Sequence, residues 1–151
     1  MKVKKLIALM LVFVMSLTFV FTLSGCEFSN TALKIESYRL CKDENNEDII
    51  IVKFHFKNNM GYATNMDDEF DVELYQNDIA LEEYYPEYNE DGSYVVDLKY
   101  NHDDQYKRIK DGGEFYPEKA FCLTDDETDV EVVIGSYFIM KREKTEIIEL
   151  N

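Results

Sequence analysis

Residues suited to chemistry are few and scattered in this 151-residue sequence. Only two histidines occur: His55 lies between two lysines in an alternating apolar segment, and His102 lies in a polar run with Asp103 and Asp104. A catalytic or metal-binding histidine needs a nucleophile, a base or further ligands beside it. Neither histidine has such partners, and no G-x-S-x-G, C-x-x-C, H-E-x-x-H or phosphate-binding glycine loop occurs. We predict solvated histidines, no catalytic residue, no defined metal site and no cofactor.

Carboxylates are abundant and gather at predicted turns. Thirty-one Asp and Glu residues against sixteen Lys and Arg residues give a net charge of −15, which speaks against nucleic acid as a partner. The clusters are Asp67-Asp68-Glu69, Asp103-Asp104, and Asp125-Asp126-Glu127 with Asp129. Such oxygens suit Ca²⁺, but none has the Asp-x-Asp-x-Asp-Gly order that fixes its geometry. Two interpretations remain: weak, diffuse binding of divalent cations, or solvated acids that keep the domain soluble.

Six tyrosines cluster between Glu82 and Tyr106, a segment whose Pro86 and Asp91-Gly92 turn predict a long loop. Loops on a rigid scaffold often carry binding residues, and tyrosine offers a large, stiff contact surface. The alternative is that the rings cover strand ends, with each hydroxyl reaching water. For a partner surface we expect several rings exposed together, bordered by carboxylates, at one end of the domain. The candidates are Tyr84, Tyr85, Tyr88, Tyr94, Tyr100 and Tyr106.

Two of the three cysteines, Cys41 and Cys122, lie in predicted strands far apart in the sequence. A compartment outside the membrane permits a disulfide between them. Closing so long a loop could stabilise the fold by about 4 kcal/mol in the chain-entropy model. The alternative is that each cysteine is free and acts as a small hydrophobic side chain. The sequence leaves both alternatives open.

The N-terminal region indicates export. Three lysines within the first five residues precede an apolar run from Leu6 to Leu23, which is the layout of a secretory signal. The run ends in Leu23-Ser24-Gly25-Cys26, which resembles a bacterial lipobox, where a small residue precedes a cysteine that is lipidated and becomes the new N-terminus. The alternative is an uncleaved transmembrane anchor. Both alternatives place the remaining chain outside the cytoplasmic membrane.

Removal of the predicted signal peptide, residues 1–25, leaves 126 residues, a normal size for one domain. It takes away three lysines and no acid, so the net charge falls from −15 to −18. Residues 26–31 form a short tether, which reaches only about 17 Å beyond Cys26 when fully extended. We therefore expect the domain, residues 32–151, to lie close to the membrane.

The strongest strand signal is Ile49–Asn59. Its even-numbered positions from 50 to 56 are apolar, whereas positions 53, 55 and 57 carry Lys, His and Lys. This period of two is typical of a strand with one face on a core and the other in water. Ile49 and Ile51 make both faces apolar at the start, which predicts a central strand that is covered on both sides there.

Other segments alternate in the same way and are separated by turn residues. A change of parity near Ser37 predicts a β-bulge, and Gln76-Asn77-Asp78-Ile79 predicts a tight hairpin turn. No amphipathic helix is indicated after Cys26. The predicted strands are residues 32–41, 49–59, 70–75, 79–81, 115–124 and 130–137. Residues 93–99 are one further candidate strand, and residues 138–140 and 147–150 supply the last pieces. Seven to eight short strands favour an all-β, antiparallel β-sandwich.

Four segments resemble a group of uncharacterised lipoprotein domains of Gram-positive bacteria with an immunoglobulin-like fold. They are Val52–Asn59, Tyr75–Glu82, Lys110–Glu114 and Phe121–Asp125. The chain departs from that group at Asp78, where Gly is usual, and near Asp111-Gly112, where Pro-Gly is usual. The resemblance covers most of residues 33–140. It implies an immunoglobulin-like sandwich at the cell surface, and no catalytic residues come with it.

Together these features predict a non-enzymatic interaction module, held on the extracellular side of the cell membrane by palmitate-type lipid on Cys26. Its expected partner is a protein or an envelope polymer. The alternative is an envelope hydrolase with a carboxylate pair, which would show two acids that converge in a cleft with shifted pKa values. A solute-binding protein is disfavoured, because one small domain cannot close around a ligand.

Overall fold

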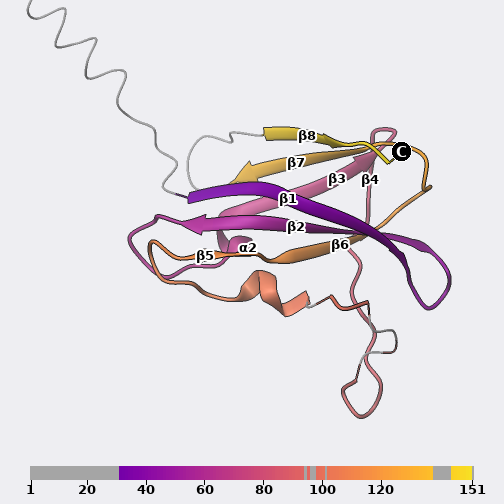
Figure 1. Cartoon of the computed structure of the whole chain (residues 1–151), viewed down its shortest axis with the longest axis horizontal. Helices are drawn as coiled ribbons and strands as arrows, with labels where there is room; N and C mark the ends of the chain where they lie inside the picture. The colour runs from indigo at the N-terminus through magenta and orange to yellow at the C-terminus, as the bar shows by residue number, and fades with distance from the viewer. Residues whose placement is uncertain (1–30, 94, 96–97, 101, 138–143, 151) are drawn as a thin grey trace, which may run out of the picture.

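The computed structural model describes residues 31–93, 95, 98–100, 102–137 and 144–150. The predicted signal peptide, Cys26, Tyr94 and the predicted strand at 138–140 lie outside these residues. The described chain forms eight strands, one α-helix of four residues and one 3-10 helix (Figure 1). The strands make two antiparallel sheets that enclose a common core, so the predicted all-β sandwich is confirmed.

The first sheet is built on the central strand β2 (Asp48–Asn58). Strand β1 (Thr31–Lys42) pairs with one edge of β2. Strands β5 (Glu114–Phe115) and β6 (Glu118–Cys122) pair with different parts of its other edge. The strongest strand signal in the sequence thus corresponds to the strand with the most neighbours.

The second sheet has the order β4-β3-β7-β8. Its strands are β3 (Phe70–Gln76), β4 (Ile79–Ala80), β7 (Val130–Ser136) and β8 (Lys144–Ile148). The turn between β3 and β4 places Asn77 and Asp78 at φ 50° and 63°. Positive φ at both central residues is what a tight hairpin turn requires, so the predicted turn is confirmed.

Two irregularities of the first sheet follow from local sequence. The register of β1 shifts between Ile35 and Ser37, which confirms the predicted bulge. The predicted strand at 115–124 is wrong as one continuous element, because Tyr116 and Pro117 interrupt it. Proline has no N–H to donate to a ladder, although the Pro117 carbonyl still accepts a 2.9 Å hydrogen bond from the Phe54 amide.

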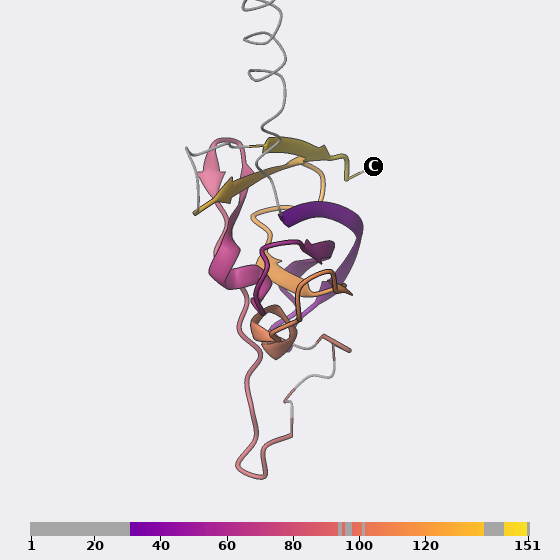
Figure 2. The ribbon, with the colours of Figure 1, turned by 90° about the vertical axis from the view of Figure 1, so that its left-hand side faces the viewer.

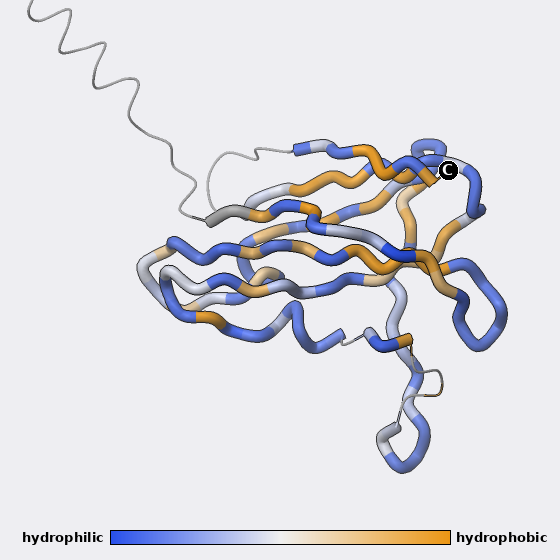
Figure 3. Tube along the Cα trace, in the orientation of Figure 1, coloured by the Kyte–Doolittle hydropathy of each residue, from blue (hydrophilic) through white to orange (hydrophobic). Residues whose placement is uncertain are grey.

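The main core fills the space between the sheets. The even-numbered side chains of β2 from Ile50 to Phe56 are fully buried there. Phe56 meets Phe70 of β3 edge to face, with ring centroids 6.3 Å apart. The hydrophobic residues follow the strands, whereas the connecting loops are mostly hydrophilic (Figure 3). Burial of one such side chain contributes about 1.5–3 kcal/mol, so this interface is the main source of stability.

The start of β2 is buried on its outer face as well, as its sequence predicts. Ile49 and Ile51 pack there beneath Tyr84 and Tyr100 in a second, smaller core. Both rings come from the segment between β4 and the 3-10 helix η1 (His102–Tyr106). The middle of this segment extends well beyond the sandwich (Figures 1 and 2).

Some elements differ from the sequence-based expectation. The loop after β2 contains the helix α2 (Met66–Glu69), which is too short to show a periodic pattern. None of the described residues of the predicted strand at 93–99 is in a strand; Lys99 has a φ of 51° there, which breaks extended backbone. Among the described residues, no helix is long and apolar enough to span a membrane.

Candidate functional site

Polar side chains are buried together at the edge of the first sheet, beside β6. Lys119 is central, with a side chain only 7% exposed. Its Nζ lies 3.0 Å from Asp67 Oδ1, on α2, and 3.7 Å from Glu83 Oε2, in the segment after β4. His102 and Gln105 of η1 adjoin Glu83. These five residues are named the edge cluster.

The position of Lys119 follows from strand register. Lys119 pairs with Val52, and residues directly opposite in a ladder point to the same side of the sheet. Val52 belongs to the main core, so Lys119 projects to the core side, as Phe121 does two residues later. A buried ammonium is costly unless it is paired, which explains why two carboxylates lie beside it.

Two local structures hold these carboxylates in place. Asn65 caps α2: its side-chain oxygen accepts a 2.7 Å hydrogen bond from the Asp68 amide. This cap starts the turn that carries Asp67. Glu83 pairs with Phe121 in an isolated antiparallel bridge, which extends the sheet beyond β6. In addition to the ion pair, the Asn65 cap therefore positions Asp67, and backbone pairing positions Glu83.

The 3-10 helix η1 places the side chains of His102 and Gln105 on the same face, because side chains three residues apart are aligned in this geometry. Gln105 Nε2 lies 3.0 Å from His102 Nε2 and 3.3 Å from Glu83 Oε1. Since an amide nitrogen can only donate, His102 Nε2 is the acceptor in this contact. Two buried atoms lack a hydrogen-bond partner among the described residues: Gln105 Oε1 and the Tyr100 hydroxyl.

The edge cluster keeps Lys119 charged. Burial on its own would lower the pKa of Lys119, but the charge of Glu83 and the hydrogen bond to Asp67 outweigh burial and raise that pKa. A lysine acts as nucleophile or base only when its amine is neutral. Lys119 is therefore suited to fixing two carboxylates, not to covalent catalysis.

Two exposed tyrosines border the edge cluster. Tyr85 is 60% exposed and Tyr106 is 46% exposed. The His102 ring contacts both, with centroids 5.0 Å from Tyr85 and 5.6 Å from Tyr106. The charge of Glu83 raises the pKa of Tyr85. Burial, then the charges of Asp67 and Glu83, raise the pKa of Tyr106. The two tyrosine hydroxyls thus lie near the same carboxylates. Tyr85 and Tyr106 are named the tyrosine rim.

The other candidate tyrosines do not join this rim. Tyr84 and Tyr100 are buried over Ile49 and Ile51, so these two are wrong as candidates for an exposed partner surface. The physical reason is the apolar outer face at the start of β2, which needs cover that no strand supplies. Tyr88 is exposed farther along the segment. Tyr94 lies outside the described residues.

Cys41 and Cys122 are free thiols on either side of Ile49. Cys41 pairs with Ile49 from β1, and Cys122 pairs with it from β6. Two strand spacings separate their Cα atoms by about 10 Å, whereas a disulfide reaches at most about 7 Å. The disulfide alternative is therefore not formed in this structure. Burial is the main cause that raises the pKa of both thiols.

His55 lies on the polar outer face of β2, away from the edge cluster. Its ring stacks on Tyr116, with centroids 4.9 Å apart and an interplanar angle of 12°. Its Nε2 lies 3.3 Å from Glu114 Oε2, and Lys57 binds the other oxygen of that carboxylate at 3.0 Å. His55 is thus partly covered by an aromatic neighbour instead of being fully solvated.

The acidic turns have protein partners of their own. Glu69 accepts a 2.6 Å hydrogen bond from the Thr64 hydroxyl. Asp125 accepts from the Thr128 amide at 2.6 Å, and this backbone hydrogen bond lowers the pKa of Asp125. In the part of the chain that the structure describes, no group of three or more His, Cys, Asp or Glu side chains could hold a metal ion.

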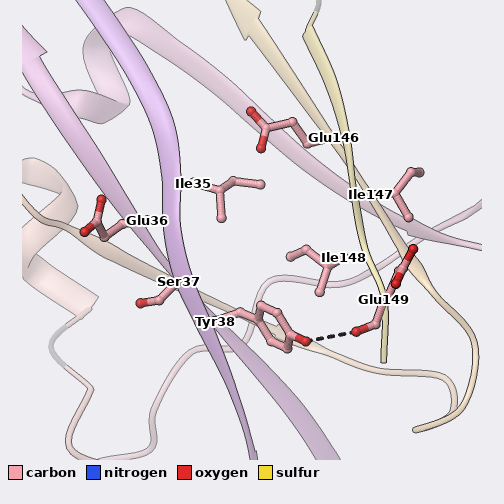
Figure 4. A pocket seen from close by; sticks show the side chains of 8 residues that line it. All are labelled: Ile35, Glu36, Ser37, Tyr38, Glu146, Ile147, Ile148 and Glu149. Atoms are coloured by element: carbon pink, nitrogen blue, oxygen red, sulfur yellow. Dashed lines mark hydrogen bonds between the residues drawn. The ribbon is translucent and has the colours of Figure 1, made fainter. Parts of the chain in front are cut away.

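A groove of about 570 Å³ lies between β1 and β8, the edge strands of the two sheets (Figure 4). The Tyr38 hydroxyl crosses it and donates a 2.9 Å hydrogen bond to the Glu149 carbonyl. Its apolar lining includes Ile35 and Ile148, and its charged residues are Glu36, Glu146 and Glu149. Its lining contains no histidine, cysteine or lysine. The groove therefore offers less chemistry than the edge cluster.

Residues 25–134 match the family model of a domain of unknown function, DUF5067. The chain belongs to the DUF5067 family. The DUF5067 match includes Cys26 and every residue of the edge cluster and the tyrosine rim, whereas β8 follows it. Family membership agrees with the expectation of an uncharacterised domain and assigns no activity.

One solved structure resembles this DUF5067 chain: a lipoprotein candidate (ycdA) from Bacillus subtilis subsp. subtilis strain 168. The TM-score is 0.56 at 21% sequence identity, and the likeness covers 79% of this chain. This chain spans 36% of that protein. At such identity the likeness shows the fold alone. No curated protein matches the sequence.

Proposed function

We propose that this DUF5067 protein is a binding module, tethered by lipid on Cys26 to the extracellular side of the cell membrane. The edge cluster carries the binding part of the proposal. Lys119 is locked as an ammonium between Asp67 and Glu83, beneath two exposed tyrosines. Fixed charges beneath an aromatic rim suit recognition, because tyrosine gives rigid contact area and the carboxylates give specificity.

Two observations support the anchor, and the start of β1 fixes how near the membrane the anchor would hold the sandwich. The basic head, apolar run and Leu23-Ser24-Gly25-Cys26 occur in the order of a lipoprotein signal. Strand β1 begins at Thr31, so only four residues separate it from Cys26 and the sandwich stays near the membrane. The structurally similar protein of Bacillus subtilis is itself described as a lipoprotein candidate.

The strand order supports an immunoglobulin-like form of the sandwich. Strands β1, β2, β3, β4, β6, β7 and β8 correspond in chain order to A, B, C, C′, E, F and G. The sheets then read A-B-E and C′-C-F-G, which resembles the A-B-E-D and C-F-G sheets of immunoglobulin domains without strand D. This fold hosts many functions, so it supports a scaffold and names no ligand.

The arrangement of carboxylates favours binding over hydrolysis. A glycosidase-type pair divides acid and base roles between two carboxylates that face a shared cleft. Asp67 and Glu83 converge instead on the ammonium of Lys119. We therefore do not propose the envelope hydrolase.

The anchor is tested by fractionating cells that express the full chain. We expect the wild type in the membrane fraction and Cys26→Ala either released or retained as an uncleaved precursor. Cys41→Ala is the matched control, because it removes a cysteine outside the lipobox and should remain in the membrane. A Cys26→Ala protein that is cleaved and retained like the wild type would disprove the anchor.

The binding part is tested on whole cells. A photo-crosslinking phenylalanine analogue replaces Tyr85, or Tyr38 on β1 as the control, in the anchored protein. Discrete adducts at position 85 and not at position 38 are the expected result. Their absence at position 85 would refute a binding role for the tyrosine rim.

A further inference from the structure

We propose that the edge cluster and the tyrosine rim form a docking surface for a lysine- or arginine-bearing segment of another protein. This inference rests on the proposed function and adds to it the class of partner and the residues that recognise it.

The charge of the surface favours a cationic partner. Asp67 and Glu83 share one ammonium, that of Lys119, so the edge cluster has an excess of negative charge. On the adjacent η1, the Asp103 side chain is largely exposed. Complementary charge steers a basic partner toward such a surface. A second copy of this chain, with a net charge of −15, would be repelled from it.

The tyrosine rim supplies the second element that Lys and Arg side chains use. A cation over an aromatic ring is attracted by its π-face, and the aliphatic stem packs on the same surface. The protein makes such contacts itself, with Lys53 5.6 Å from the Tyr116 ring centre and Lys107 4.6 Å from that of Phe115. Among the described residues, no Lys or Arg is placed over the tyrosine rim in this way.

An unmatched acceptor inside the edge cluster gives independent support. Gln105 is 1% exposed, and its amide contacts Glu83 and His102. The Oε1 of the same amide has no hydrogen-bond partner in the described chain. A buried carbonyl without a donor is unfavourable. A lysine or arginine side chain brings several N–H donors, and its entry requires the His102 side chain, which is 14% exposed, to move aside.

A protein side chain fits these features better than a metal ion. Within the described residues, no three His, Cys, Asp or Glu side chains could hold a metal ion. A metal ion would also leave the tyrosine rim unused, whereas the stem of Lys or Arg covers it. We therefore assign the surface to a basic polypeptide.

The test measures binding of a fluorescent octa-lysine peptide to the full-length protein in detergent, by anisotropy at physiological salt. Tyr85→Ala and Tyr106→Ala should each weaken binding about three- to five-fold, the range expected of one cation–π contact. Tyr38→Ala is the matched control, since Tyr38 is 43% exposed but lies on β1. It should bind like the wild type. The rim variants should keep the melting temperature of the wild type, because truncation of exposed side chains costs little stability. Tyr38→Ala also removes the hydrogen bond from the Tyr38 hydroxyl to the Glu149 carbonyl, so binding is compared at a temperature at which every variant is folded.

Three results would overturn the inference. The first is that octa-lysine shows no saturable binding. The second is that the rim variants bind octa-lysine as tightly as Tyr38→Ala does. The third is that millimolar Ca²⁺ displaces octa-lysine whereas Na⁺ at the same ionic strength does not. The outcomes distinguish failure of this inference from failure of the proposed function. Adducts at position 85 on cells, without affinity for octa-lysine, would keep the binding role and reject the basic partner. Adducts at position 85 whose formation is suppressed by octa-lysine added before irradiation would support both.

Discussion

Lys119 and Asp67 are 52 positions apart in the sequence, yet the Lys119 ammonium donates a 3.0 Å hydrogen bond to the Asp67 carboxylate. The bond joins β6 to α2. It also fixes the ammonium against Glu83, from a third part of the chain. The ion pair therefore holds together the elements that carry the candidate site.

We predict that Lys119→Ala lowers the free energy of unfolding by about 2–4 kcal/mol, because two carboxylates then lose their shared counter-charge. The estimate lies toward the low end for buried pairs, since the Asp67 side chain is 37% exposed. Lys144→Ala, which removes an exposed lysine from β8, should change it by less than about 0.5 kcal/mol. Urea denaturation measures the free energy of unfolding of both variants. A loss for Lys119→Ala as small as that for Lys144→Ala would show that the ion pair does not stabilise the fold.

Alkaline pH should destabilise the second core. Burial is the first cause that raises the pKa of Tyr84, to about 12, and it also raises the pKa of Tyr100. Both pKa values exceed that of an unfolded tyrosine, about 10. The stability that the two neutral, buried phenols contribute is therefore fully present below pH about 10. It is lost as the pH rises toward 12 and beyond.

The measurement is the ultraviolet absorbance of tyrosinate during an alkaline titration. Two of the tyrosines should ionise late and together with unfolding. Tyr84→Phe should remove one of them, whereas Tyr38→Phe on β1 should leave the late phase unchanged. A titration in which all tyrosines ionise before unfolding would contradict the burial of Tyr84 and Tyr100.

The local features of the fold were predictable because they depend on neighbours in sequence. The alternation in β2, the bulge near Ser37 and the Asn77-Asp78 turn are of this kind. The apolar pair Ile49 and Ile51 correctly indicated cover on the outer face. What supplies that cover could not be read from the sequence, because it depends on how a distant loop folds back.

The candidate site was missed for the same reason. Lys119 shares its strand parity with Phe121, and a lysine at a core-facing position is a signal of a buried ion pair. The sequence does not reveal which acids reach it, since Asp67 and Glu83 arrive from separate loops. The exposed Tyr85 and the buried Tyr84 are adjacent, so composition alone could not separate them.

We predict that Cys41 and Cys122 react as two free thiols. In the Cys26→Ala variant, alkylation under denaturing conditions without reductant should add two labels to the intact mass. In the native state the reaction should be slow at neutral pH and faster as pH rises, because burial raises the pKa of both thiols. An intact mass without labels would show a disulfide and a different register around Ile49.

Gln76 should be a major stabilising residue, because its buried side-chain amide makes four hydrogen bonds. Its Nε2 donates to the carbonyls of Asp125 and Thr128 at 3.1 and 2.7 Å. Its Oε1 accepts from the amide and hydroxyl of Thr124, both at 2.9 Å. Gln76→Ala should cost about 2–4 kcal/mol of unfolding free energy. Asn45→Ala, in an exposed turn, should cost below about 0.5 kcal/mol in the same urea titration.

The proposed lipid on Cys26 is tested most directly by mass spectrometry of the N-terminal peptide. The protein is extracted from membranes with detergent and digested. We predict a first peptide that begins at Cys26 and carries two acyl chains, since a single chain gives only marginal membrane attachment. An unmodified first peptide that begins at Met1, or one that begins after Cys26, would contradict the lipid anchor on which the proposed function depends.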